Sequence, residues 1–173
     1  MRTRTATWFE TKIRYEKTME DGLQKKVTEL YVVDSLSFTE AENMIIDEMS
    51  SYISGDFAVT DIKKAAYDEI FFSDSASDDR WYKAKLQFIT IDEKTEKEKR
   101  SSVTYLVQAG SLNGAVAHIN EVMGGTMIDY AIASVAETQI MDVFEHHVKG
   151  VQPADNELET EQGVSKKTGE ETE

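Results

Sequence analysis

The sequence contains no cysteine and only one proline. The lack of cysteine excludes disulfides, thiolate metal sites and cysteine nucleophiles, and it favours a reducing compartment. No stretch approaches the roughly 20 consecutive apolar residues of a membrane span. The basic first residues lead into Trp8-Phe9-Glu10 and further charges, not into the apolar run of a signal peptide. We therefore expect a cytoplasmic protein that has no contact with a membrane.

Motifs for catalysis and cofactor binding are also missing. There is no phosphate-binding loop, no Gly-x-Gly-x-x-Gly stretch and no Gly-x-Ser-x-Gly elbow. The three histidines are His118, in an apolar helical stripe, and the adjacent pair His146 and His147, whose side chains would point to opposite faces of a strand. The many carboxylates single out no catalytic pair. These absences predict a non-enzymatic protein without a cofactor or metal ion.

What the sequence does contain is an internal repeat with a register of 73 to 74 residues. Trp8-Phe9 is matched by Trp81-Tyr82, and Tyr31-Val32-Val33 is matched by Tyr105-Leu106-Val107. A register that persists through several separate segments indicates two copies of one structural unit.

The first copy shows which elements the unit contains. Alternating Phe9, Ile13 and Tyr15 predict a half-buried strand, and Asp21-Gly22 predicts a hairpin turn into a second strand. A helix is predicted to begin at Ser37, because a glutamate follows three residues later, as in a capping box. The second copy has Ser111 but carries Gly114 in place of that glutamate, so its helix cap is expected to be weaker.

Each copy ends in a long third strand, at about residues 57–72 and 130–144. The apolar positions change parity between Val59 and Ile62, and the second copy shows the same change, which predicts a β-bulge in both. Gly124-Gly125 is expected to end the second helix.

The sequence therefore predicts an α+β protein built from a tandem duplication of a β-β-α-β unit. Two such units pair pseudo-symmetrically in an antiparallel sheet, continuous or divided into two packed sheets, with the helices on one side. The expected units are residues 1–73 and 80–148, joined by a linker at 74–79. Residues 149–173 contain the one proline and many acids, and we expect a disordered acidic tail there.

The net charge of −14 is unevenly distributed. Residues 1–33 carry seven Lys and Arg against five Asp and Glu, and residues 80–100 carry seven against four. In contrast, residues 34–79 carry two against twelve. Both copies are thus basic in their opening hairpin, within an otherwise acidic chain.

Strand alternation assigns these cations to one face. If Phe9, Ile13 and Tyr15 face the core, then Trp8, Lys12 and Arg14 share the opposite face, as do Trp81, Lys83 and Lys85 in the second copy. A tryptophan beside cations suits single-stranded DNA or RNA, because bases stack on aromatic rings and phosphates attract cations. These six residues form the predicted nucleic-acid site.

Two other interpretations remain open. The tryptophans could pack against the other repeat or against a second subunit, which would make the chain a protein–protein interaction or assembly module and a possible homodimer. The lysines could simply keep an exposed strand soluble. The acidic tail could compete for the nucleic-acid site or bind a protein partner. An enzyme is the least favoured class.

The sequence resembles domain-of-unknown-function family 4494, whose members occur in Bacteroides and related bacteria. The resemblance rests on Trp8-Phe9-Glu10, the stretch from Tyr31 to Glu42, the stretch from Asp79 to Lys85, and Met123-Gly124-Gly125-Thr126. It covers nearly all of residues 1–146. It implies a bacterial or phage-borne cytoplasmic protein, and it implies no activity and no catalytic residues.

Overall fold

The computed structural model describes residues 1–146, and the predicted tail and His147 lie outside this part. The elements follow one another as β1 (Arg2–Thr5), β2 (Trp8–Thr18), β3 (Gln24–Asp34), α1 (Phe38–Ser50), β4 (Phe57–Lys64), β5 (Glu69–Phe72), β6 (Arg80–Ile91), β7 (Glu98–Ala109), α2 (Leu112–Gly124), β8 (Asp129–Glu137) and β9 (Ile140–Phe144). Strand, strand, helix and strand recur in both halves, and the α+β class agrees with the prediction.

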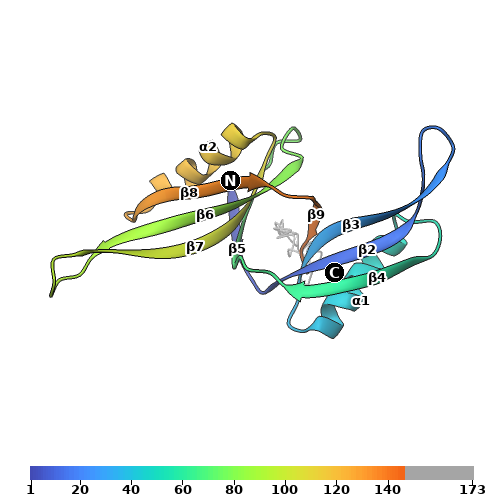
Figure 1. Cartoon of the computed structure of the whole chain (residues 1–173), viewed down its shortest axis with the longest axis horizontal. Coiled ribbons are helices and arrows are strands. Elements are labelled where there is room, and N and C mark those ends of the chain that lie inside the picture. The colour runs from blue at the N-terminus through green and yellow to red at the C-terminus, as the bar shows by residue number, and fades with distance from the viewer. Residues whose placement is uncertain (147–173) are drawn as a thin grey trace, which may run out of the picture.

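The strands form two sheets, in the orders β1-β5-β7-β6-β8 and β4-β2-β3-β9. We call these the five-stranded and the four-stranded sheet. Their long hairpins, β6–β7 and β2–β3, extend toward opposite ends of an elongated molecule (Figure 1). Each sheet is covered by one helix, so the helices lie as predicted, and the division into two sheets is one of the two arrangements that the sequence left open.

The two halves exchange their last strands. β5 leaves the first half and pairs in parallel with β7, while β9 leaves the second half and pairs in parallel with β3. The long third strand that the sequence predicted is therefore split in each copy, and a wholly antiparallel arrangement is wrong. Because each sheet contains a strand from the other half, residues 1–73 and 80–148 are not two separate sheets.

Both predicted bulges are present. Lys12 lies opposite Asp61 and Ile13 lies opposite Val59, so one residue of β4, Thr60, has no partner in β2. The same shift in β8 occurs where Lys85 pairs with Ser134 and Leu86 pairs with Ile132. A bulge of this kind re-aims the side chains beyond it, which explains the change of apolar parity in both copies.

The helix caps follow the sequence closely in the first half. Ser37 Oγ accepts a hydrogen bond from the Glu40 backbone N–H at 3.1 Å, and the Glu40 carboxylate accepts one from the Leu36 N–H at 2.7 Å. In the second half, Ser111 Oγ accepts from the Gly114 N–H at 3.0 Å. The second helix thus has the serine cap without the glutamate of a capping box.

A distant residue replaces that glutamate. Asp78, in the segment between β5 and β6, accepts a hydrogen bond from the Gly110 N–H at 2.8 Å, and Gly110 is the counterpart of Leu36. The Ser73 hydroxyl donates to the same carboxylate. Asp78 therefore binds a backbone N–H that directly precedes α2 and also fixes the segment that connects the two halves.

Replacing Asp78 with alanine should lower the free energy of unfolding by about 1–2 kcal/mol, since a capping acceptor is lost and the Gly110 N–H is left without its partner. Urea unfolding followed by circular dichroism measures this change. The neighbouring Asp79 is exposed and lies 3.9 Å from Arg80, so Asp79→Ala serves as the control and should change stability by less than about 0.5 kcal/mol. Equal effects of the two substitutions would contradict the capping role.

Three apolar cores hold the molecule together. In each half one core lies between a helix and its sheet, and the helix contributes an alanine, an isoleucine and a methionine spaced four residues apart, namely Ala41, Ile45 and Met49 in α1 and Ala115, Ile119 and Met123 in α2. The third core, which we call the central core, lies where the two sheets meet. Its members come from both halves: Trp8, Val32, Tyr67, Ile70, Phe72, Trp81, Leu106, Ile140 and Val143.

Candidate nucleic-acid interface

The two tryptophans of the predicted site are buried. Trp8 is 1% exposed and Trp81 is 3% exposed, and both belong to the central core. The prediction that they present outward stacking platforms is therefore wrong. Strand alternation placed them correctly on the face away from the helices, but at this end of each strand the other half of the chain covers that face.

Phe72 connects the two tryptophans. Its ring centroid lies 6.4 Å from that of Trp8 and 5.7 Å from that of Trp81, in an edge-on arrangement with the latter. The Trp8 indole N–H donates to the Asp68 carbonyl at 3.1 Å. Packing against the other repeat, one of the alternatives drawn from the sequence, thus accounts for both tryptophans within one chain.

The four predicted cations remain on the helix-free faces of β2 and β6. Lys12, Arg14 and Lys85 are exposed, and Lys83 is half-buried. Lys12 Nζ lies 3.9 Å from Asp61, whereas neither Arg14 nor Lys85 has a carboxylate within 4.0 Å among residues 1–146. The structure therefore leaves at least two of the predicted cations available to an anion.

Lys83 is held close to the central core. Its Nζ lies 5.7 Å from the ring centroid of Tyr67, within the range of a cation–π contact. Burial, and then the nearby Glu10 carboxylate, raise the pKa of Tyr67, so this ring stays uncharged beside the lysine. Lys83 thus lies against a member of the central core, which sets it apart from the three exposed cations.

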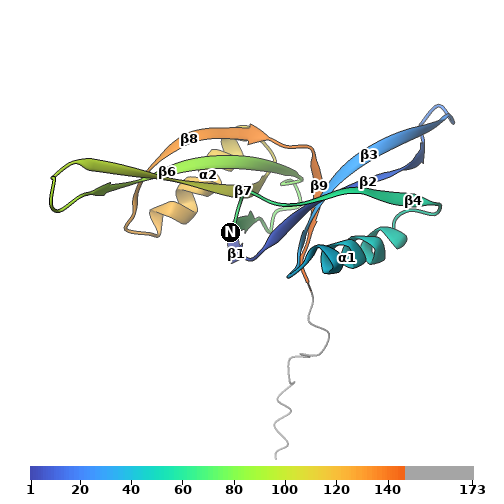
Figure 2. The same cartoon turned by 60° about the horizontal axis from the view of Figure 1, so that its bottom comes forward.

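The helix-free faces of both sheets point to the same side of the molecule. In Figure 2 the two helices lie on the lower side, and the faces that carry the cations look upward. The charged residues of α1 are all acidic (Glu40, Glu42, Asp47 and Glu48), and they lie on the helix side. The four cations therefore share the helix-free faces with Glu16 and Asp61, whereas α1 carries carboxylates and no cation.

Several polar residues on the same faces were not predicted from the sequence. Lys26 lies opposite Glu16, and Thr28 lies opposite Arg14. In the five-stranded sheet, Thr104 and Ser134 flank Lys85 on either side, and Ser102 lies opposite Gln87. The register of the Asp21-Gly22 hairpin could have identified Lys26 and Thr28, whereas the position of Ser134 depends on the bulge in β8.

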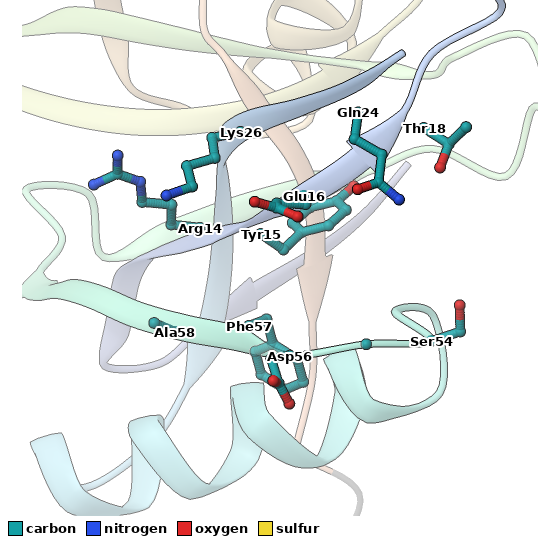
Figure 3. A pocket seen from close by; sticks show the side chains of 11 residues that line it. Arg14, Tyr15, Glu16, Thr18, Gln24, Lys26, Ser54, Asp56, Phe57 and Ala58 are labelled. Carbon is teal, nitrogen blue, oxygen red and sulfur yellow. The ribbon is translucent and has the colours of Figure 1, made fainter. Parts of the chain in front are cut away.

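A hollow of about 820 Å³ lies at the outer end of the four-stranded sheet. Arg14 and Lys26 project side by side at one rim, and the loop that contains Asp56 forms the opposite wall near α1 (Figure 3). Glu16 also lines it. With two cations and two carboxylates around a wide opening, this hollow suits transient contact with a polymer better than enclosure of a small molecule.

A serine, an aspartate and a histidine come together beside α2 but not in the order that catalysis needs. The Ser73 hydroxyl donates to Asp78, and His118 Nε2 lies 3.6 Å from the same carboxylate oxygen. A nucleophilic serine requires an imidazole as its direct base, and here the carboxylate lies between them. His118 Nδ1 lies 3.0 Å from the Gln108 carbonyl, so the half-buried ring contacts the end of β7.

The two arginines of β1 join the start of the chain to the residues that follow β9. Arg2 donates two hydrogen bonds of 2.8 Å to the Glu145 carboxylate, and Arg4 binds both Glu145, at 3.0 Å, and the buried Asp34. These contacts tie β1 to the end of β9 and to the end of β3. The hydrogen bonds from Arg2 and then from Arg4 hold the pKa of Glu145 below its usual value, against the opposing effect of burial.

Stability should therefore fall in acid as Glu145 is protonated. A carboxyl group whose pKa is lower in the folded state stabilises the fold at neutral pH, and this contribution disappears as the pH falls below about 4.5 toward the lower folded value. Glu145→Gln should lower stability at pH 7 by about 1 kcal/mol and flatten the loss between pH 5 and 3. Glu137→Gln, which removes an exposed partner of Arg80, is the control, and an equally flattened profile for that variant would contradict the prediction.

In residues 1–146, no group of three or more histidine and carboxylate side chains gathers as metal ligands would. None of the helices in the described part of the chain has the length and hydrophobicity of a membrane span.

No curated protein and no solved structure matches the chain. A domain of unknown function, DUF4494, matches residues 7–146, which include every element from β2 to β9. The chain belongs to this DUF4494 family.

Proposed function

We propose that the chain is a non-enzymatic binding module whose helix-free sheet faces bind single-stranded nucleic acid through its phosphates. The main support is that four cations gather on the helix-free faces in a chain of net charge −14. Lys12, Arg14, Lys83 and Lys85 occupy faces that point to one side, and α1 carries carboxylates and no cation on the other.

Burial of the tryptophans changes the expected mode of binding. Without exposed rings on these faces there is no base stacking, which contributes ~1–3 kcal/mol per base where it occurs. Affinity would come from phosphate contacts, with Thr104, Ser134 and Thr28 as additional hydrogen-bond donors beside the cations. Binding of this kind is weak, tolerant of sequence and strongly dependent on salt.

The test is the fluorescence anisotropy of a labelled 20-nucleotide oligothymidine titrated with the full chain at several salt concentrations. The tryptophans are buried, so an external label is the better reporter. Four phosphate contacts predict a slope of log Kobs against log salt of about −3, since each contact on a single strand contributes about −0.7. The double variant Lys12→Glu/Lys85→Glu should weaken binding at low salt at least about tenfold and make the slope less steep by about 1.4.

Lys25→Glu/Lys99→Glu is a matched control. Lys25 lies opposite Lys17, and Lys99 lies opposite Thr90, which places both cations on the other face of the same two hairpins. This variant has the same net charge as the test variant and should bind nearly as well as the parent. No binding at low salt, or equal losses for both double variants, would reject the proposed face.

The cytoplasm of Bacteroides-type bacteria or of cells infected by their phages is the setting that we propose, as the family resemblance implies. Fractionation of such cells with an antibody against the chain would test this location. Signal confined to the membrane or periplasmic fraction would reject it.

A further inference from the structure

One edge of the four-stranded sheet lacks a strand that its counterpart possesses. In the five-stranded sheet β5 is covered by β1, which pairs with it antiparallel from Arg2 opposite Phe72 to Thr5 opposite Glu69. β9 is the counterpart of β5, and within residues 1–146 no strand pairs with its outer edge. The row of backbone N–H and C=O groups along β9 is therefore open.

The side chains next to this edge show the same asymmetry. Phe71 and Tyr105 pack together beside β1 and are 1% and 7% exposed. Their counterparts Phe144 and Tyr31 also stack, with centroids 5.7 Å apart, but both are only half-buried. Tyr52 continues this stack at 6.4 Å from Phe144 and is 72% exposed. An aromatic surface that is covered in one half thus stays open in the other.

Chain connectivity explains why β9 remains uncovered. β1 directly precedes β2 of the four-stranded sheet but pairs in the five-stranded sheet. The segment in the same position of the second half, residues 75–78, joins β5 to β6, and both of these strands belong to the five-stranded sheet. Asp78 is also fixed by its bond to Gly110. This segment therefore cannot lie along β9.

β1 shows what kind of segment fits such an edge. Arg2 lies over the Phe72 ring, with its guanidinium carbon 4.2 Å from the ring centroid. The Met1 side chain packs on the apolar core beneath α2, and its amino group lies 3.8 Å from Glu121. Glu121 occupies the position in α2 that Asp47 occupies in α1, so a strand on β9 would bring its leading residue toward Asp47.

The surface beside β9 is acidic. A hollow of about 400 Å³ lies between α1 and the end of β9, and its lining includes four carboxylates, those of Glu40, Asp47, Glu48 and Glu145. Glu145 is neutralised by the arginines of β1, and Glu40 lies 3.8 Å from His146, whereas neither Asp47 nor Glu48 has a cationic partner among the described residues.

Two identical acidic edges would repel each other, and residues 147–173 carry seven Asp and Glu against three Lys. These charges disfavour both a second copy and the chain's own tail as the covering strand.

We propose that the outer edge of β9 binds an extended, basic peptide segment of a partner protein, which adds to the sheet as an antiparallel strand. Backbone hydrogen bonds to β9 supply affinity, as in other cases of strand addition. An apolar residue at the start of the segment covers Phe144 and Tyr52, and a cation beside it lies against Asp47. The peptide site is separate from the phosphate-binding face, because it is an edge of the sheet and the carboxylate-lined hollow beside it lies against α1.

The probe is a labelled synthetic peptide with the sequence of residues 1–7 of this chain, titrated into the full-length protein by fluorescence anisotropy. Saturable binding is expected, together with protection of β9 amides from hydrogen exchange. Asp47→Lys should weaken binding about tenfold by reversing the charge that faces the peptide. Glu42→Lys is the matched control, since this exposed glutamate of α1 does not line the hollow, and it should bind like the parent.

A cysteine at Met141 gives a second measurement that does not depend on affinity. Met141 lies in β9 and is 52% exposed, and the chain has no other cysteine to react. Met141→Cys should form a disulfide by thiol–disulfide exchange with a peptide whose cysteine is activated by thionitrobenzoate, and should do so faster than Thr60→Cys, which places the thiol on the edge strand β4. No saturable binding below about 1 mM peptide, or equal cross-linking at both positions, overturns the proposal.

Hydrogen exchange of the protein, measured without and with the peptide, distinguishes the other occupants. Protection of β9 that appears together with protection of residues 147–173 would identify the tail as the occupant. Protection of β9 that rises with protein concentration would identify a second copy. Protection of β5 instead of β9 on adding the peptide would show that it only exchanges with β1. Each of these results overturns the proposal.

Discussion

Replacing Trp8 with alanine should lower the free energy of unfolding by about 3–5 kcal/mol, the range typical of a fully buried tryptophan. Trp8 is 1% exposed, packs on Phe72, and donates its indole N–H to the Asp68 carbonyl at 3.1 Å. Removing it creates a cavity between the two sheets and leaves that carbonyl without its partner. Because small domains are stable by only about 5–15 kcal/mol, the variant should be close to unfolding at 37 °C.

Urea unfolding followed by circular dichroism measures this loss. Trp81→Ala should behave in the same way, because Trp81 is also buried and packs on Phe72. Trp8→Phe keeps most of the volume and loses the hydrogen bond, so it should fall between the parent and Trp8→Ala. The control is Tyr52→Ala, an aromatic residue that is 72% exposed, with an expected loss below about 1 kcal/mol. A small effect of Trp8→Ala would show that the central core is not formed as described.

The local features of this fold could be read from the sequence because each depends on residues close together in the chain. Gly22 adopts a φ of +81° in the predicted hairpin turn, a conformation that glycine accepts at little cost. Ser37 and Ser111 cap the two helices, and the parity change after Val59 marks a bulge. Turn chemistry, capping and side-chain alternation all act over a few residues, so one copy of a pattern was enough to predict them.

The exchange of β5 and β9 could not be predicted in this way. Ile70 and Val143 are apolar and would suit either sheet, and nothing in the alternation states which strand an edge will pair with. The replacement of a capping glutamate by Asp78 is hidden for the same reason, since Asp78 lies 32 residues from the N–H that it binds. Partner choice is a property of the whole chain, and local patterns carry no information on it.

The same limit explains the error in the predicted nucleic-acid site. Alternation correctly separated Trp8, Lys12 and Arg14 from the helix-facing residues, but it says only which side of a strand a residue occupies. The first part of that side is covered by the other half of the chain, and the rest is exposed. A strand face can therefore be half core and half surface, and the boundary falls between Trp8 and Lys12.

Gly110→Ala is expected to lower the free energy of unfolding by about 2–3 kcal/mol, since it forces atoms together in a closely packed place. A Cβ atom at Gly110 would lie 2.6 Å from the Ser77 carbonyl oxygen and 3.3 Å from the Asp78 carboxylate. The first of these is a backbone atom that no side-chain rotation can move. The segment between β5 and β6 must therefore shift away, and the bond from the Gly110 N–H to Asp78 is then lost as well.

Thermal and urea unfolding of Gly110→Ala, Asp78→Ala and the double variant separate the steric effect from the lost bond. Gly110→Ala already disrupts the bond that Asp78→Ala removes, so the losses of the two single variants should not add in the double variant, as is usual for residues in contact. Gly55→Ala is the control, because a Cβ there meets no atom within 4 Å, and it should be neutral or slightly stabilising. Additive losses would mean that the Gly110 contact and the Asp78 cap act independently, and that the segment joining the two halves is not held as one unit.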